Sequence, residues 1–149
     1  MSIVFINGSP NKTGNTEHLA KRLLQGKEYD TVNLTDYKIY AYGQHFDDDQ
    51  YDAVIQAMAD HDVVVIGSPM YWHSMCGAVR NVLDRAYGYV RQGQFSGKKL
   101  FFIFQGAAPT QEQLAAADYT MGRFAAMYGF TYAGMITNQA EAATQSANV

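Results

Sequence analysis

The chain is poor in cysteine, with Cys76 alone among its 149 residues. An intramolecular disulfide is therefore excluded, and this cysteine usage is typical of a reducing compartment. No apolar run approaches the roughly 20 residues that a membrane-spanning helix needs. The first residues, MSIVFIN, also lack the basic start and the long apolar stretch of a signal peptide. We therefore expect a cytoplasmic protein without a membrane partner.

Neither positive nor negative charge is in large excess. Charged residues make up 17% of the chain and the net charge is −3. This excludes the basic patch of nucleic-acid-binding proteins and is too mild for a solvating acidic tail. The histidines show no metal-ligand spacing, and the single acidic run, Asp47–Asp49, is typical of a solvated turn or helix start. We expect neither a nucleic-acid partner nor a metal site.

Short apolar runs alternate with stretches of helical periodicity along the whole chain. Strands are predicted at residues 2–6, 29–34, 62–67, 99–104 and 130–136, and helices at 15–25, 50–60, 74–91 and 110–128. The last dozen residues fit either a short helix or a frayed tail. Continuous apolar strands of this kind are typical of parallel sheets covered on both faces.

This alternation predicts an α/β fold in one domain, residues 1–149. The expected architecture is a doubly wound sheet of five parallel strands in the order 2-1-3-4-5, with helices on both faces. In such sheets ligands bind beyond the carboxyl ends of the strands, where the strand order switches. The loops at 7–15, 68–77 and 105–109 are therefore the candidate site.

The first of these loops, NGSPNKTGNT, has the composition of an anion-binding site. A helix N-terminus attracts phosphate, and Gly8 and Gly14 let the backbone approach a ligand closely. Short donor side chains and one cation complete the loop: Ser9, Lys12, Thr13, Asn15 and Thr16. The alternative is a flexible turn in which Asn15 or Thr16 caps the helix.

The spacing of the glycines narrows the choice of phosphate. Five residues separate Gly8 from Gly14, and Asn15 stands where a P-loop has its lysine. The dinucleotide fingerprint is absent as well. A single terminal phosphate held without a metal fits best, and FMN carries such a group.

The second loop, SPMYWHSMCG, offers Pro69, Met70, Tyr71 and Trp72 as a stiff, flat apolar surface for a planar ring system. The alternative is that these side chains cap the core. In the third loop, QGAAP, Gln105 has an amide for a flavin or its ribityl chain, and Gly106 permits close approach. That loop fits an ordinary turn equally well.

Together, INGSPNKTGNT and GSPMYWHSMCGAVRNVLDR resemble the flavodoxin-like, NAD(P)H-dependent FMN oxidoreductases, a group that includes FMN reductases, quinone reductases and iron–sulfur flavoproteins. The resemblance covers nearly the whole chain. It implies that Ser9, Lys12, Asn15 and Thr16 hold the FMN phosphate, with Gly14 at the turn, and that the segment from Pro69 to Trp72 positions the ring. It also implies a homodimer.

The segment 36–49 lacks the cysteines that hold the cluster in the iron–sulfur relatives, so an iron–sulfur centre is excluded. Its aromatic side chains fit a wall of a substrate site, a dimer contact or a local satellite core. Cys76 is no phosphatase nucleophile, because Val82 stands where the arginine of a Cys-x5-Arg loop is required. Arg80 and Asp84 are predicted to form a surface ion pair.

The function that we expect from these features is FMN-dependent oxidoreduction. NAD(P)H would be the co-substrate, and a quinone, a nitro or azo compound, or a flavin would be the acceptor. No side chain is needed as a catalytic acid or base. The alternative is a flavodoxin-type electron carrier, which Lys12 and the mild charge disfavour. Asn7-Gly8 and Ser68-Pro69 exclude a phospho-receiver, which needs acidic residues at these places.

Overall fold

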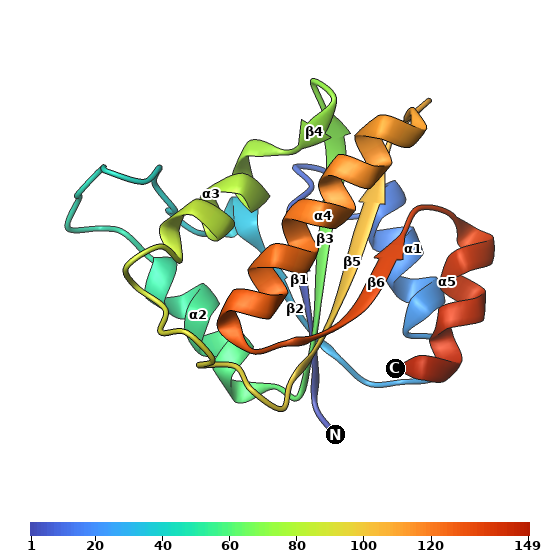
Figure 1. Ribbon diagram of the computed structural model, residues 1–149, viewed down its shortest axis with the longest axis horizontal. Coiled ribbons are helices and arrows are strands. Elements are labelled where there is room, and N and C mark those ends of the chain that lie inside the picture. Colours follow the sequence, from blue (N-terminus) through green and yellow to red (C-terminus); the bar gives the residue numbers. More distant parts are fainter.

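The structure, a computed structural model, describes residues 1–149 as one central sheet with helices on both faces (Figure 1). The strands are β1 (Ile3–Asn7), β2 (Asp30–Asn33), β3 (Val63–Tyr71), β4 (Ser74–Met75), β5 (Lys99–Gln105) and β6 (Thr131–Ile136). The α-helices are α1 (Asn15–Leu23), α2 (Tyr51–Asp60), α3 (Gly77–Arg85), α4 (Gln111–Tyr128) and α5 (Gln139–Gln145). Two 3-10 helices are η1 (Leu34–Asp36) and η2 (Ser146–Asn148).

The main sheet is parallel throughout, with the strand order β2-β1-β3-β5-β6. This is the predicted order, because β5 and β6 are the fourth and fifth predicted strands. The short strand β4 pairs only with β3, in antiparallel orientation. The predicted fold class is therefore confirmed, and β4 is the addition that the sequence pattern did not show.

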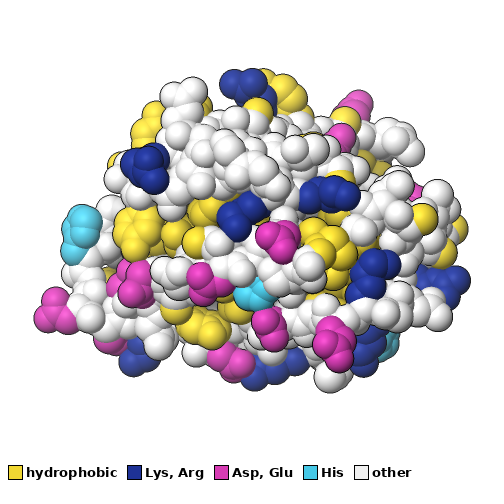
Figure 2. Space-filling view, turned by 90° about the horizontal axis from the view of Figure 1, so that it is seen from below, with side chains coloured by type: hydrophobic (Ala, Val, Ile, Leu, Met, Phe, Trp, Pro, Cys, Tyr) yellow, Lys and Arg dark blue, Asp and Glu magenta, His cyan; other side chains and the backbone are white.

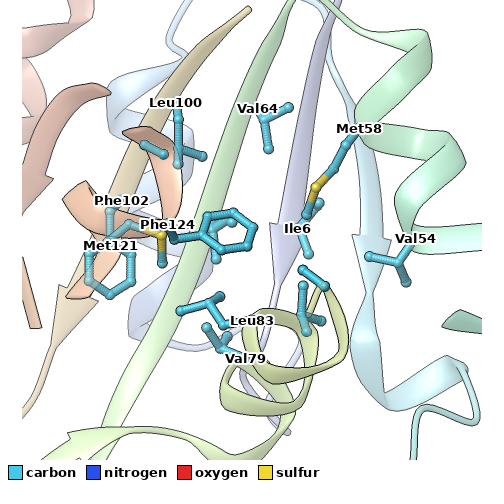
Figure 3. Packing of buried hydrophobic residues seen from close by; sticks show 14 of the residues in the cluster. Ile6, Val54, Met58, Val64, Val79, Leu83, Leu100, Phe102, Met121 and Phe124 are labelled. Carbon is cyan, nitrogen blue, oxygen red and sulfur yellow. The ribbon is translucent and has the colours of Figure 1, made fainter. Parts of the chain in front are cut away.

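Successive residues of each strand point to opposite faces of the sheet, so two cores form. Helices α2, α3 and α4 cover one face over a cluster of 26 buried residues, among them Ile6, Val64 and Phe102 (Figure 3). Helices α1 and α5 cover the other face over 12 buried residues, which include Phe5 and Ile103. The strands are apolar on both sides because both sides are buried.

Two predicted boundaries are wrong in the region of the second candidate loop. Strand β3 continues to Tyr71 instead of ending at residue 67, and helix α3 covers Gly77–Arg85 instead of 74–91. Ser74 and Met75 are in a strand because they pair with Tyr71 and Met70. The chain leaves the helix before Gly88, which has a left-handed φ of 73°.

The segment from Tyr37 to Gln50 is an ordered arch attached to α3. Arg85 donates to both carboxylate oxygens of Asp49 (3.0 and 2.6 Å) and to the Tyr40 carbonyl (3.0 Å). The Tyr40 and Phe46 rings lie 4.5 Å apart within the arch. These contacts attach the arch to α3, but Tyr42 and Phe46 are 61% and 53% exposed, so the arch does not enclose a buried core of its own.

The last residues form α5 and η2, which decides for a helix over a frayed tail. Seen from below, where the strands begin, the surface carries cationic and anionic side chains of both signs between apolar patches (Figure 2). No helix combines the length and the apolar character needed to cross a membrane.

Candidate functional site

The β1–α1 loop lies at the carboxyl edge of the sheet and is held by its own side chains. The Ser9 amide donates to Asn7 Oδ1 (3.0 Å), and the Asn11 amide donates to Ser9 Oγ (3.1 Å). The Thr13 amide donates to Asn11 Oδ1 (3.2 Å). This succession of short side-chain turns fixes the backbone as it enters α1.

Helix α1 begins without a side-chain cap. Gly14 occupies the N-cap position, and no side chain accepts from the first turn. The amides of Asn15, Thr16 and Glu17 have no partner within a helix at this position. The hydroxyls of Ser9 and Thr16 each accept one hydrogen bond and keep their own hydrogen to donate. The loop is therefore rich in donors that the chain itself does not use.

Lys12 forms an ion pair with an acidic side chain outside the first loop. Its ammonium group lies on the Asp36 carboxylate of η1 at 2.5 Å, and both side chains are about half exposed. The cation thus belongs to the first loop but points to a neighbouring acidic group. Exposed pairs of this kind contribute little to stability, so the ammonium group is available to a stronger anion.

The second loop is a tight hairpin between β3 and β4. Trp72 and His73 form its two-residue turn, with φ values of 49° and 67°. Both values lie in the left-handed region that favours glycine. The Trp72 side chain is 92% exposed and Tyr71 is 48% exposed, so neither caps the core. The side-chain amide of Gln113 in α4 donates from Nε2 to Nδ1 of His73 (2.6 Å), which connects the turn to α4.

The third loop contacts both of the others. Gln105 donates from Nε2 to Thr16 Oγ1 (3.2 Å), which connects it to α1. A Cβ atom at Gly106 would lie 2.8 Å from Met70 Cε. Glycine at this position therefore lets the Met70 side chain pack directly against the backbone. Pro69 is buried in β3 in register with Gln105. The structure thus brings the predicted residues of all three loops to one edge.

Gly8 and Cys76 form the floor under the first two loops. A Cβ atom at Gly8 would lie 2.3 Å from Val79 Cγ2, so only glycine fits against α3. Cys76 is buried, and its thiol donates to the Gly8 carbonyl (3.3 Å). The Cys76 amide donates to Ser68 Oγ (2.9 Å). The cysteine therefore connects the two loops.

Arg80 and Asp84, one turn apart on α3, form the predicted surface ion pair (3.1 Å).

A polar hollow of about 260 Å³ opens at the same edge beside α1. Its lining includes three predicted residues, Asn15, Gln105 and Gly106, and several that the sequence analysis missed: His18, Thr137, Asn138 and Gln139. Thr137 and Asn138 follow directly after β6. The rule that ligands lie beyond the carboxyl ends of parallel strands could have indicated them.

The residues present fit the phosphate of FMN. The start of α1 brings together unpaired helix amides, the exposed side-chain amide of Asn15 and the buried side chains of Ser9 and Thr16 with their hydroxyls, and the loop from Gly8 to Thr16 contains no acidic residue. Backbone and hydroxyl donors at a helix N-terminus are the groups that bind a phosphate without a metal. The exposed aromatic hairpin and the third loop border the same space.

Comparison with known proteins identifies a family model that covers almost the whole chain and curated relatives that match part of it. A family model described as NADPH-dependent FMN reductase matches residues 1–144. YwqN of Bacillus subtilis (strain 168), whose assigned name describes an NAD(P)H-dependent FMN-containing oxidoreductase, is 29% identical over 103 residues. That match covers 64% of this chain and 57% of YwqN.

Two further relatives extend the comparison. An iron–sulfur flavoprotein of Archaeoglobus fulgidus is 32% identical over 99 residues, covering 58% of this chain and 49% of that protein. The chain thus spans about half the length of these curated relatives. The Trp repressor binding protein from Bacillus subtilis superimposes with a TM-score of 0.73 at 22% identity, covering 91% of this chain and 85% of that one. This last likeness shows the fold alone.

Proposed function

Since the chain belongs to the NADPH-dependent FMN reductase family, we propose that it binds FMN at the carboxyl edge of its sheet. We propose further that it transfers a hydride from NADPH or NADH to a small electron acceptor. The observation that carries this proposal is the uncapped start of α1, where unused amides meet the hydroxyls of Ser9 and Thr16. The alternative, a mere flexible turn, does not explain why the ordered loop leaves these donors unused.

The residues have distinct roles in this proposal. Ser9, Asn15 and Thr16 bind the phosphate together with the α1 amides, and Gly14 leaves the helix end open. Lys12 adds a positive charge that it now shares with Asp36. Binding the phosphate at a helix N-terminus stabilises it by hydrogen bonds and by the helix dipole. We therefore assign these residues the role of binding the FMN phosphate.

The hairpin and the third loop would orient the ring system. Pro69 and Met70 form the base of the hairpin, and Tyr71 and Trp72 present aromatic surface at its tip. Gln105 and Gly106 fix the distance between this hairpin and α1. The bound flavin would supply the redox chemistry, so we assign no side chain as a catalytic acid or base.

The acceptor that we propose is a quinone, a nitro or azo compound, or a free flavin. The protein would act in the cytoplasm as a homodimer of single-domain chains, residues 1–149. The exposed hairpin leaves the ring site open to a second planar substrate, which supports successive binding of nucleotide and acceptor at one face.

An anaerobic titration tests the proposal. The purified chain is saturated with FMN, and NADPH or NADH is added while the visible absorption of oxidised flavin is followed. Prompt bleaching, reversed by a quinone, is expected of the enzyme. Bleaching by dithionite but by neither nucleotide would instead indicate a flavodoxin-type carrier. Absence of FMN binding would refute both functions.

A further inference from the structure

Asn7 is a buried polar residue at the end of an apolar strand. It follows the apolar residues of β1, and its side chain is fully buried. Burying a carboxamide costs free energy unless its polar groups find partners. Both ends of the Asn7 carboxamide have one, because Oδ1 accepts from the Ser9 amide (3.0 Å) and Nδ2 donates to Asn33 Oδ1 (3.1 Å). Asn7 therefore connects the first loop to strand β2.

Asn33 reaches the first loop from outside it. This residue ends β2, the edge strand of the sheet, and it lies opposite Asn7 in the register of β1 and β2. Asn7 points to the same face as Phe5, two residues before it, and this is the face that α1 covers. The bond to Asn7 is the one hydrogen bond of the Asn33 side chain. It spans 26 positions of the sequence.

From Asn7 the hydrogen bonds continue along the loop in steps of two residues. Ser9 Oγ accepts from the Asn11 amide (3.1 Å), and Asn11 Oδ1 accepts from the Thr13 amide (3.2 Å). We call this series of bonds, which begins at Asn33 and ends at Thr13, the loop relay. It reaches from the edge strand to the residue before the N-cap of α1.

The loop relay decides which backbone amides are left for a ligand. It uses the amides of Ser9, Asn11 and Thr13. The Gly8 and Gly14 amides donate to carbonyls of the backbone (2.8 and 3.3 Å). The amides that donate to no group of the chain are those of Lys12, Asn15, Thr16 and Glu17. A loop of another conformation would leave a different set of amides free.

The orientation of the Asn7 carboxamide depends on Asn33. A carboxamide has one accepting end and one donating end. The acceptor at Asn33 favours the orientation in which Nδ2 faces β2 and Oδ1 faces the Ser9 amide. Without that acceptor, the reversed orientation gains in population, and it turns Nδ2 toward the Ser9 amide. Two donors then face each other, and the first bond along the loop is lost.

We propose that Asn7 and Asn33 are positioning residues for the phosphate of FMN, an inference that rests on the proposed function. Both act through the loop. Asn33 holds the Asn7 carboxamide, Asn7 holds Ser9, and the relay fixes the free amides before the ligand arrives. A preorganised loop binds more tightly because it loses less conformational freedom on binding. The residues that set FMN affinity thus extend to the edge strand, outside the three loops.

Amide hydrogen exchange, followed by NMR on the protein without FMN, tests the relay. Asn33→Leu removes the acceptor at similar volume, and Asn33→Ala removes it without added apolar bulk. In both variants the Ser9 amide should exchange roughly tenfold faster relative to the Ile6 amide of β1, which reports on opening of the sheet. Asn33→Asp keeps an acceptor and should exchange as the wild type does. Thr31→Ala, at an exposed position of the same strand, should also have no effect.

A comparison of FMN with riboflavin, which lacks the phosphate, tests the role in binding. Quenching of flavin fluorescence gives both dissociation constants. Asn33→Leu and Asn33→Ala should weaken FMN binding roughly tenfold and change riboflavin binding by less than about twofold. A role in stability alone would not distinguish the two flavins.

Three results would overturn the positioning role. They are unchanged exchange of the Ser9 amide in Asn33→Leu and Asn33→Ala, unchanged FMN affinity in these variants, and an equal loss of affinity for both flavins. The exchange measurement also separates this inference from the proposed function. A wild type that binds no FMN, together with faster Ser9 exchange in the variants, would refute the proposed function and support the loop relay.

Discussion

Helices α1 and α4 begin at the same edge of the sheet, but in opposite ways. At α4, Thr110 Oγ1 accepts from the Gln113 amide (3.2 Å) and Gln113 Oε1 accepts from the Thr110 amide (2.9 Å), which forms a complete capping box. At α1, Gly14 stands at the cap position and no side chain accepts from the first turn. Side chains therefore cap the first amides of α4, whereas the first amides of α1 are left without a side-chain acceptor.

The β3–β4 hairpin departs from local backbone preference. Its turn needs two left-handed residues, for which Asn-Gly is the common choice, yet the chain has Trp72 and His73 there. Each left-handed residue other than glycine costs about 1 kcal/mol or more. Departures from local preference are expected at functional sites. The start of α4 is therefore explained by stability alone, whereas we propose ligand binding for the start of α1 and for the hairpin.

The largest expected effect comes from one matched pair of isosteric changes. Asn15 and Gln111 are the exposed first residues of α1 and α4. Asn15→Asp places a carboxylate beside the proposed phosphate and should weaken FMN binding roughly 100-fold, or about 3 kcal/mol at 5 Å in a medium of intermediate dielectric. Quenching of flavin fluorescence on titration measures the dissociation constant.

Gln111→Glu is the control for this change. Both variants add an anion at the start of a helix and should each stabilise the fold by about 0.5 kcal/mol. Only Asn15→Asp should lose FMN affinity. Equal FMN affinities in the two variants would contradict the assignment of the α1 terminus as the phosphate site.

The second prediction repairs the hairpin turn. Replacing Trp72-His73 by Asn-Gly should raise the free energy of unfolding by about 1–2 kcal/mol, because the left-handed strain is relieved and Trp72 has little packing to lose. The same variant should reduce turnover with NADPH. Urea denaturation and steady-state kinetics measure the two effects, and a stabilised variant with full turnover would show that the strained pair has no role in the reaction.

The third prediction removes the cap of α4. Thr110→Ala should lower the free energy of unfolding by about 1 kcal/mol, since the Gln113 amide loses its acceptor. FMN affinity should not change by more than about twofold, because the proposed phosphate site is at the start of α1 and not at the start of α4. Thermal melting and FMN titration on the same preparation decide the point. A large loss of FMN affinity would place α4 among the phosphate-binding elements.

The smallest effect concerns the opposite end of a helix. His61 follows α2, with Nδ1 2.6 Å from the Ala57 carbonyl and Nε2 2.7 Å from Asp30. Burial alone would lower the pKa of His61, but the hydrogen bonds to Asp30 and to Ala57 outweigh it and raise this pKa above its ordinary value. A positively charged imidazole at the C-terminus of α2 also stabilises the helix by about 0.5–1 kcal/mol.

The sign of the pH effect follows from that shift. The folded protein binds this proton more tightly than the unfolded chain, so the stabilisation is complete below pH 6.5, the ordinary histidine value. It is lost as the pH rises through the higher folded-state pKa. Urea denaturation of the wild type and of His61→Gln over this range should show the loss in the wild type alone, and parallel curves would contradict it.

The fold could be predicted because burial on both faces leaves a strong signal. Residues 63–66 and 100–104 are continuous apolar runs, and each lies in a central strand that helices cover on both sides. The hairpin could not be predicted in the same way. Left-handed φ values at Trp72 and His73 contradict the turn preferences of these residues, and a strand as short as β4 has no periodicity of its own.

The site was predictable in its loops and less so in its contacts. The glycines and hydroxyls around α1 indicated the loop, but the pairing of Lys12 with Asp36 depends on η1, which no local pattern marks. Thr137 and Asn138 enter the polar hollow only because β6 ends beside β5. Tertiary neighbours of this kind are set by strand order.

The β5–α4 loop contacts both of the other loops, and this limits which loop exchanges the protein can accept. Gln105 touches the first loop through Thr16, and Gly106 fits against Met70 of the second. The third loop therefore contacts both of the others, and its shape has to match theirs. Chimeras that exchange one loop for that of a relative should misalign the remaining two, whereas exchange of all three as a set should preserve the edge.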